Sequence, residues 1–453
     1  MSDTVRGVSR QRLASFQSAE TARFEAHYPA SGAAAARARG FYAGVPMHWM
    51  LDWPSPFPLA VAEARGARLW TVEGIELDDF CLGDTGSMFG HSPEPVLRTL
   101  ASQAGRGFTY MLPTAEAYAV GALLEERFGL PHWQVATTAS DANRFALRVA
   151  RAVTGRPNVL VINGCYHGAV DETYVELHDG VARNRPGLIG QAVDLAAHSR
   201  VVEFNDLAAL EVALSDRSVA VVLAEPVMTN CCMVLPQPGY HAALREITRR
   251  TGTLLLIDET HTISTGVRGY TGAHGLQPDF FVLGKPIAGG TPASVWGFTH
   301  DIAVRWDEIR RTKAPGHSGI GTTLSANALA MALMRVTLEE VMTDAAYAHM
   351  EEQASRLAAG LKAAIDRYQL PWHVVRVGAR VEFVCAPGPL ENGTQAHAAH
   401  CAELEAAVHM GLLNRGCLIA PFHNMMLVCP ATTAEQVDRL VTAFEAVLAA
   451  LVA

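Results

Sequence analysis

The segment "PDFFVLGKPIAGG", from Pro278 to Gly290, contains an apolar run that ends in a lysine. The run Phe280–Leu283 is continuously apolar, which predicts a strand in a sheet that is covered on both faces. Gly284 follows, and Lys285 then places a charged amine where the chain leaves the core. Ligands of open α/β sheets bind at the carboxyl ends of strands, so Lys285 is the first candidate functional residue.

The rest of the chain continues this pattern of short apolar runs separated by helical patterns. Such alternation predicts an α/β fold, in which a mostly parallel sheet has helices on both faces. The other runs expected as strands are "QVATT" ending at Thr138, "NVLVI" ending at Ile162, "VAVVLA" ending at Ala224, "TLLLI" ending at Ile257 and "SVWGF" ending at Phe298. Between the first two, apolar residues at helical spacing predict a helix whose N-cap is Ser140. Another helix is expected from Ala326 to about Met342, before a helix-rich α+β region.

Composition and charge narrow the classes of function. With 453 residues, of which 49% are hydrophobic and 18% charged, the chain is long enough for one large domain and a smaller one. The net charge of −9 and the absence of a lysine-arginine block argue against nucleic acid or a membrane surface as partner, so small molecules are expected. No apolar run approaches the ~18 residues of a membrane span, and the N-terminus does not resemble a secretory signal.

The eight cysteines contain no CxxC pair, and no His or Cys residues have the spacing of metal ligands. This usage favours reduced thiols over a disulfide framework or a zinc site. We therefore expect no bound metal and a cytoplasmic location.

Polar residues follow the predicted strands. Asp258 and Glu259 come directly after the strand that ends at Ile257, and Asp258 precedes Lys285 by 27 positions (285 − 258). That separation is about the length of a crossover back into the sheet. The carboxylate and the amine are therefore expected at the same edge.

Two further loops at the predicted edge suit a phosphate and an aromatic ring. Thr138 and Ser140 supply hydroxyls at a helix start, where backbone N–H groups and the helix dipole favour an anion. In "NGCYHG", Tyr166 supplies an aromatic face beside Gly168, which allows close approach. Together with a lysine and a buried acid, these features indicate pyridoxal 5'-phosphate, in which the lysine forms the Schiff base and the acid keeps the pyridine nitrogen protonated.

Seven blocks of the sequence, taken in order, resemble the class III, fold-type I pyridoxal-phosphate-dependent aminotransferases. They are most similar to glutamate-1-semialdehyde aminomutase and its aminotransferase relatives. The blocks are "LDDFCLGDTGSMFGHSP", "TTASDANRFALRVAR", "NGCYHG", "AEPV", "LLLIDETHT", "LGKPIAGG" and "GTTLSAN". The resemblance implies a seven-stranded, mostly parallel sheet and a homodimer with shared active sites. It also implies an N-terminal segment over residues 1–70, a large cofactor-binding domain over 71–325 and a small α+β domain over 326–453.

The resemblance also implies roles for single residues. Lys285 is the Schiff-base lysine, and Asp258 is the partner of the pyridine nitrogen. The other cofactor contacts that it implies are Tyr166 on one ring face, Thr260 on the other, His261 near the ring hydroxyl, Glu225 as a hydrogen-bonding residue, Thr138, Ala139 and Ser140 at the phosphate, and Thr322 and Thr323 from the neighbouring subunit. Ala139 replaces the family's glycine, and His261 stands where the family often has glutamine.

The substrate-binding residues depart further from the resemblance. His48 in "PMHWM" and His423 in "PFHNM" stand near positions where relatives acting on β-amino acids have arginines. Trp53 is a further candidate, and Arg380 in "GARVEF" is a candidate for holding a carboxylate. An imidazole cannot give a carboxylate the charged, forked pairing of a guanidinium. Hydrophobic or aromatic amino compounds are therefore the expected substrates.

The function expected from these features is an aminotransferase that moves an amino group from an amino acid or amine to an oxo acid, aldehyde or ketone. An aminomutase of the glutamate-1-semialdehyde type is the alternative, and an epimerase is a more distant one. A pyridoxal-phosphate-binding regulator without turnover is disfavoured because no basic helix-turn-helix segment flanks the core. The amino donor and the acceptor are left open.

Overall fold

The computed structural model describes residues 3–314, 316 and 318–452, and the chain forms two compact units. The central unit consists of residues 94–344 and 390–398. The terminal unit joins both ends of the chain and consists of residues 1–93, 345–389 and 399–453. Among the helices of the described residues, none has the length and apolar character needed to cross a membrane.

A seven-stranded sheet forms the core of the central unit, in the order β10-β7-β11-β12-β13-β14-β6. The neighbouring strands from β10 to β13 are parallel, whereas β14 is antiparallel to both of its neighbours. The bounds are β6 His132–Ala136, β7 Asn158–Ile162, β10 Ser199–Val202, β11 Val219–Ala224, β12 Leu254–Asp258, β13 Phe280–Leu283 and β14 Ser294–Phe298. The predicted α/β fold with a mostly parallel seven-stranded sheet is confirmed.

The sequence patterns found most of these strands. The predictions for β7, β11, β13 and β14 are confirmed at the residues where they end. β12 continues one residue further than predicted, to Asp258. β6 ends at Ala136, two residues before the predicted end at Thr138, because Thr137 and Thr138 lead into helix α5. The edge strand β10 was not predicted, since Ser199 and Arg200 interrupt its apolar character.

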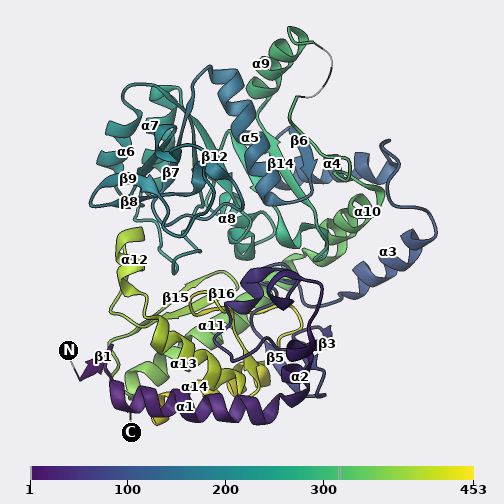
Figure 1. The fold of residues 1–453 in the computed structure, drawn as a ribbon. Coiled ribbons are helices and arrows are strands. Elements are labelled where there is room, and N and C mark those ends of the chain that lie inside the picture. The colour runs from purple at the N-terminus through teal and green to yellow at the C-terminus, as the bar shows by residue number, and fades with distance from the viewer. Residues whose placement is uncertain (1–2, 315, 317, 453) are drawn as a thin grey trace. The chain divides into compact units, whose positions relative to one another are not determined.

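Helix α5 (Ala139–Thr154) connects β6 to β7 and packs across β6, β11, β12, β13 and β14 (Figure 1). Its buried residues recur at the predicted helical spacing. The predicted N-cap Ser140 is wrong: Thr138 is the N-cap, and its side chain accepts a hydrogen bond from the Asp141 N–H. The Ser140 hydroxyl instead accepts a hydrogen bond from the Ala169 N–H at 2.9 Å. Thr138 and Ser140 are both suitable N-cap residues, so a contact outside the helix determines which of them caps it.

The remaining elements of the central unit surround this sheet. β8 (Val175–His178) and β9 (Val181–Asn184) form a separate hairpin. The helices are α3 Glu94–Ala104, α4 Ala115–Phe128, α6 Leu207–Leu214, α7 Tyr240–Thr251, α8 Gly269–Ala273, α9 His300–Arg311, α10 Ala328–Val336 and α12 Gly393–Ala399, the last residue of which belongs to the terminal unit. The helix expected from Ala326 to Met342 is α10 followed by a π-helical turn.

The terminal unit combines mostly antiparallel strands with helices, and its one parallel pair among the described strands is β17 with β5. One sheet has the order β17-β5-β4-β3 and another has the order β15-β16-β18. The strands are β1 Thr4–Val5, β2 Val8–Ser9, β3 Val61–Arg65, β4 Arg68–Thr71, β5 Glu76–Asp79, β15 His373–Val377, β16 Arg380–Val384, β17 Cys417–Leu418 and β18 Met425–Leu427. The helices are α1 Arg10–His27, α2 Pro29–Arg37, α11 Asp344–Arg367, α13 Ala402–Leu413 and α14 Ala434–Val452. The predicted smaller C-terminal domain with both helices and strands is confirmed, whereas the predicted domain bounds 1–70, 71–325 and 326–453 stay a prediction.

Candidate active site

Lys285 stands immediately after the buried strand β13, as the first residue of a short 3-10 turn (Lys285–Ala288). Its φ of 45° lies in the left-handed region, which costs a residue with a side chain about 1–2 kcal/mol. The side chain is half-buried, and Nζ lies 2.9 Å from His261 Nε2. Non-glycine residues held in this backbone region cluster at functional sites. The strained backbone therefore places the amine in a defined position at the sheet edge.

Asp258 ends β12, the strand beside β13, so its carboxylate lies at the same sheet edge as Lys285. Oδ2 accepts hydrogen bonds from Asn143 Nδ2 at 2.8 Å and from His167 Nδ1 at 3.0 Å, and Oδ1 accepts from the Thr260 N–H at 3.1 Å. Burial raises the pKa of Asp258, but the hydrogen bonds, led by His167, lower it to about 2. The carboxylate is therefore ionised at neutral pH.

His167 is the charged partner of this carboxylate. Burial lowers the pKa of His167, but the hydrogen bond to Asp258, the interactions with Cys165 and the charge of Asp258 together outweigh burial and raise the pKa to about 10. The two side chains form a buried ion pair, oriented further by the Asn143 amide, which also donates to the His167 carbonyl at 3.1 Å. Asn143 was missed by sequence reasoning, although a fully buried asparagine in the apolar stripe of α5 is the signal that could have found it.

The start of α5 lies close to two other segments of the edge. A Cβ added to Gly284 would lie 2.9 Å from the Ala139 Cβ, so the end of β13 touches the predicted phosphate turn. A Cβ on Gly168 would lie 2.1 Å from the Ser140 Oγ. These approaches require glycine, and they leave backbone N–H groups of the helix start at the sheet edge. The arrangement suits an anion such as a phosphate.

Three other predicted residues lie at or near this edge. Thr260 is buried, and its hydroxyl accepts a hydrogen bond from the Gly284 N–H at 3.3 Å. Tyr166 is exposed in the loop after β7. Glu225 follows β11 and accepts from the Thr229 hydroxyl and the Asn230 amide, so it orients neighbouring groups while burial raises its pKa.

The predicted phosphate contacts from a neighbouring subunit are Thr322 and Thr323. Both are exposed, and the hydroxyl of Thr322 lies 3.4 Å from that of Thr137 in the same chain. The role of these threonines across a dimer stays a prediction.

The four predicted substrate residues belong to the terminal unit. His48 is exposed in a 3-10 turn (His48–Leu51), and Trp53 is half-buried. His423 Nδ1 lies 2.8 Å from Glu382 Oε1. Burial lowers the pKa of His423, but the raising interactions, led by the charge and the hydrogen bond of Glu382, together outweigh burial and raise the pKa. Arg380 is completely buried.

Arg380 is held inside the terminal unit. Its Nη1 donates to the Thr85 hydroxyl at 2.6 Å, and its Nη2 lies 3.7 Å from Asp84 Oδ1. Both partners lie in a loop whose backbone is left-handed at Asp84 and Thr85. These contacts hold the guanidinium of Arg380, on β16, against the loop that contains Asp84 and Thr85. The role of Arg380 in holding a substrate carboxylate stays a prediction.

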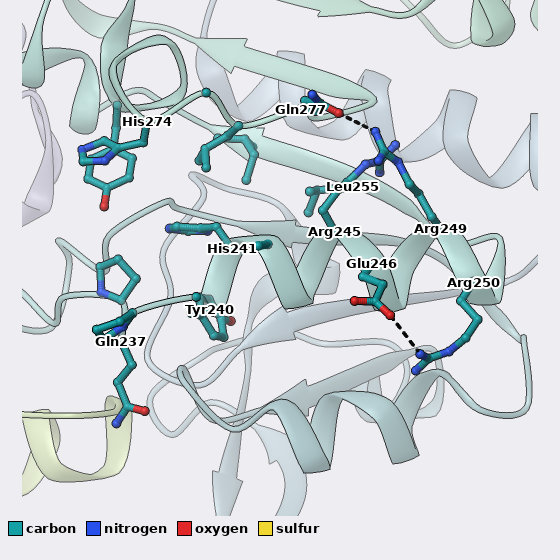
Figure 2. A pocket seen from close by; sticks show the side chains of 18 residues that line it. Gln237, Tyr240, His241, Arg245, Glu246, Arg249, Arg250, Leu255, His274 and Gln277 are labelled. Carbon is teal, nitrogen blue, oxygen red and sulfur yellow. Dashed lines mark hydrogen bonds and ion pairs between the residues drawn. The ribbon is translucent and has the colours of Figure 1, made fainter.

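A separate cavity of about 930 Å³ lies in the central unit between α7 and the segment around α8 (Figure 2). Its charged groups pair with one another or with nearby polar groups: Arg245 forms two hydrogen bonds with Asp279, and Arg249 donates to Gln277. Among the described residues that line it are neither Lys285 nor Asp258. The cavity therefore lies apart from the predicted chemistry.

Comparisons with known proteins agree with this geometry. The family described as "Aminotransferase class-III" matches residues 51–448. The chain belongs to this family. A curated relative, the glutamate-1-semialdehyde 2,1-aminomutase of Anaeromyxobacter sp. (strain K), is 30% identical over 394 residues, which cover 85% of this chain and 89% of that protein.

Solved structures give the same assignment. The crystal structure of a glutamate-1-semialdehyde aminomutase from Pseudomonas aeruginosa PAO1 matches this structure with a TM-score of 0.96 and 49% sequence identity. The match covers 98% of this chain and 100% of that chain. A variant of that protein, 48% identical over the same shares of both chains and with the same TM-score of 0.96, was solved in complex with PMP. The protein is therefore a pyridoxal-phosphate-dependent enzyme of fold type I.

The residues present fit this cofactor. The Asp258 carboxylate has about four acceptor sites, of which the three hydrogen bonds described above occupy three, so it has capacity to accept a pyridine N–H. Gly168 and Gly284 approach the helix start more closely than a residue with a Cβ could, and the backbone N–H groups of a helix start suit a phosphate. Among the residues described, no cluster of three or more His, Cys, Asp or Glu side chains has the arrangement of a metal site.

Proposed function

We propose that the protein is an aminotransferase that moves an amino group from an amino acid or amine to an oxo acid, aldehyde or ketone. The observation that carries this proposal is that Asp258 ends β12 and Lys285 follows the adjacent strand β13, at the same sheet edge. Lys285 supplies an amine for the Schiff base, and Asp258 supplies a carboxylate that is ionised at neutral pH.

Each residue has a physical role in this proposal. Pyridoxal phosphate, when bound, supplies a ring that accepts electrons from the substrate. Asp258, fixed by its ion pair with His167, holds the proton on the pyridine nitrogen by its charge. The helix start at Thr138–Ser140 binds the phosphate. The Lys285 amine, at the same sheet edge, would carry a proton away from or back to the substrate carbon.

The residues predicted to contact the substrate favour a hydrophobic amino compound. Within the terminal unit, Trp49 and Phe422 pack edge to face with ring centroids 6.4 Å apart, beside the two predicted histidines. Both rings are partly exposed, so they offer apolar surface. The guanidinium of Arg380 is fully buried against Thr85. This combination supports an apolar amine more than a small dicarboxylic acid.

The similarity to aminomutases favours a second candidate, an intramolecular amino shift. The two candidates differ in stoichiometry. A transaminase converts donor and acceptor in equal amounts, and it shows no multiple turnover when only one of them is supplied. An aminomutase converts a single substrate without a partner.

The experiment supplies the purified holoenzyme with glutamate-1-semialdehyde alone, and in parallel with an aromatic amine plus an oxo acid. Paired conversion in the second arm supports the transaminase. Sustained turnover of glutamate-1-semialdehyde alone, with no conversion in the second arm, would reject the transaminase and support the aminomutase. The homodimer with shared sites and the cytoplasmic location belong to the same proposal, and each stays a prediction.

A further inference from the structure

The cavity of about 930 Å³ beside α7 takes no part in the function proposed above. It lies on the face of β12 that points away from α5. Leu254 and Leu256 belong to the core cluster that contains residues of α5, whereas Leu255 and Ile257, which alternate with them along the strand, line the cavity. Its volume is within the range of roughly 300–1,000 Å³ that is typical of small-molecule sites.

One wall of the cavity is a row of basic side chains on α7. His241, Arg245 and Arg249 line the cavity and are spaced four residues apart, so they lie on one face of the helix. Figure 2 shows Arg245 and Arg249 extending from α7 toward the segment that carries Gln277. From His241 to Arg249 the row is about 12 Å long, at about 1.5 Å per residue.

The charge of Arg249 has no acidic partner among the described residues, in contrast to the charges of its two neighbours in the cavity wall. Arg245 forms two hydrogen bonds with the Asp279 carboxylate, and Arg250 is paired with two glutamates. Arg249 instead donates to the neutral side-chain oxygen of Gln277 at 2.6 Å. The cavity therefore has an exposed positive charge that a ligand can neutralise.

The end of the cavity away from Arg249 is aromatic (Figure 2). The rings of Tyr270 and His274 stack with their centroids 3.8 Å apart, and the His241 ring lies edge-on to Tyr270 at 5.8 Å. Burial lowers the pKa of His241 to about 4, so its imidazole is neutral at pH 7 and donates from Nε2 to the Pro226 carbonyl at 2.8 Å. Aromatic side chains arranged in this way offer a surface on which a planar ring can pack.

We propose that this cavity is a binding site for an elongated aromatic acid. The ring of the ligand lies against Tyr270 and His274, and its carboxylate or phosphate pairs with the guanidinium of Arg249. A guanidinium binds either anion through two parallel hydrogen bonds, so the shared chemistry is a ring joined to an anion that reaches along the row on α7. The site lies within the central unit, and it goes beyond the proposed function because it uses neither Lys285 nor Asp258.

The test compares three elongated probes by isothermal titration calorimetry: biphenyl-4-carboxylate, biphenyl-4-yl phosphate and the neutral biphenyl-4-carboxamide. The protein is the holoenzyme after borohydride reduction and desalting, because the reduced cofactor stays attached and occupies its own site. At least one of the two acids should bind, and the amide should bind at least ~10-fold more weakly, as expected when a charge-assisted hydrogen bond is lost. The acid that binds more tightly identifies the kind of anion that the site takes.

Two variants locate the binding. Arg249→Gln removes the charge, retains a good helix former and breaks no described ion pair, so it should weaken binding of the acid at least ~10-fold and that of the amide by less than about twofold. Arg310→Gln is the matched control, since it removes another exposed arginine from a helix of the central unit, α9, that does not line the cavity. Its affinity for both probes should stay within about twofold of wild type.

Three results would overturn the proposal. Equal affinity for the acids and the amide would exclude recognition of the anion. Unchanged affinity of the acids in Arg249→Gln would place their binding elsewhere in the molecule. Failure of both acids to bind wild type at about 1 mM would exclude the site outright. The titrations involve no turnover, so their outcome is separate from the choice between transaminase and aminomutase.

Discussion

Replacing Gly168 by alanine tests the predicted phosphate turn with a magnitude that follows from the structure. Gly168 has a φ of +83°, and the new methyl would lie 2.1 Å from Ser140 Oγ and 3.0 Å from Ser140 Cα. The left-handed backbone costs about 1–2 kcal/mol, and the steric overlap adds about 1–3 kcal/mol. Since the overlap includes the Ser140 backbone, rotation of the hydroxyl alone cannot relieve it. The first turn of α5 must move.

Gly155→Ala is the matched control at the other end of the same helix. Gly155 has a φ of +68°, and a Cβ there meets nothing within 4 Å, so this variant has the backbone strain without the overlap. Pyridoxal-phosphate affinity, measured by fluorescence titration of the cofactor-free variants, should fall about 10- to 100-fold for Gly168→Ala, because about 1–3 kcal/mol of overlap falls on the turn that binds the phosphate. Gly155→Ala should stay within about twofold of wild type. Equal affinities in both variants would refute the placement of the phosphate.

Three other predictions follow from the ion pair and from the proposed dimer. Asp258→Asn should retain the folded structure but lose at least ~100-fold in turnover, about 2.7 kcal/mol in the barrier, because a neutral amide holds the pyridine proton poorly; near-normal kcat would contradict this role. The pKa of His167 is raised in the folded state, so its contribution to stability is complete below pH 6.5 and is lost as pH rises toward about 10. The unfolding free energy of the cofactor-free protein should therefore fall by up to about 5 kcal/mol over that range in urea titrations, and His167→Gln should show a flatter profile. Thr323→Ala should weaken cofactor binding and dimerisation together, as seen by analytical ultracentrifugation with and without cofactor, because a shared site links the two equilibria; full-affinity binding by a monomer would exclude a shared site.

The sequence was sufficient where local pattern and strand order determine position. Asp258 and Lys285 follow apolar runs, and runs that pair in parallel bring their carboxyl ends to one edge, so their proximity could be inferred without coordinates. The same reasoning located Tyr166 in the loop after β7.

The sequence was insufficient where contacts between distant elements decide. Thr138 and Ser140 have similar intrinsic preference for an N-cap, and only the Ala169 N–H determines that Ser140 faces another loop. Asn143 is within an apolar helical stripe, and its hydrogen bond to Asp258 depends on how α5 lies on the sheet. The contact between Lys285 and His261 depends likewise on the left-handed backbone at the lysine, which no periodicity reveals.

The most direct test of the central claim is borohydride reduction of the holoenzyme followed by peptide mass spectrometry. With only three lysines in the chain, the attachment site is unambiguous. The proposed function predicts one phosphopyridoxyl group per chain on the peptide that contains Lys285, with none on those that contain Lys313 or Lys362. Attachment to either of the other two lysines, or unchanged labelling in Lys285→Ala, would contradict it.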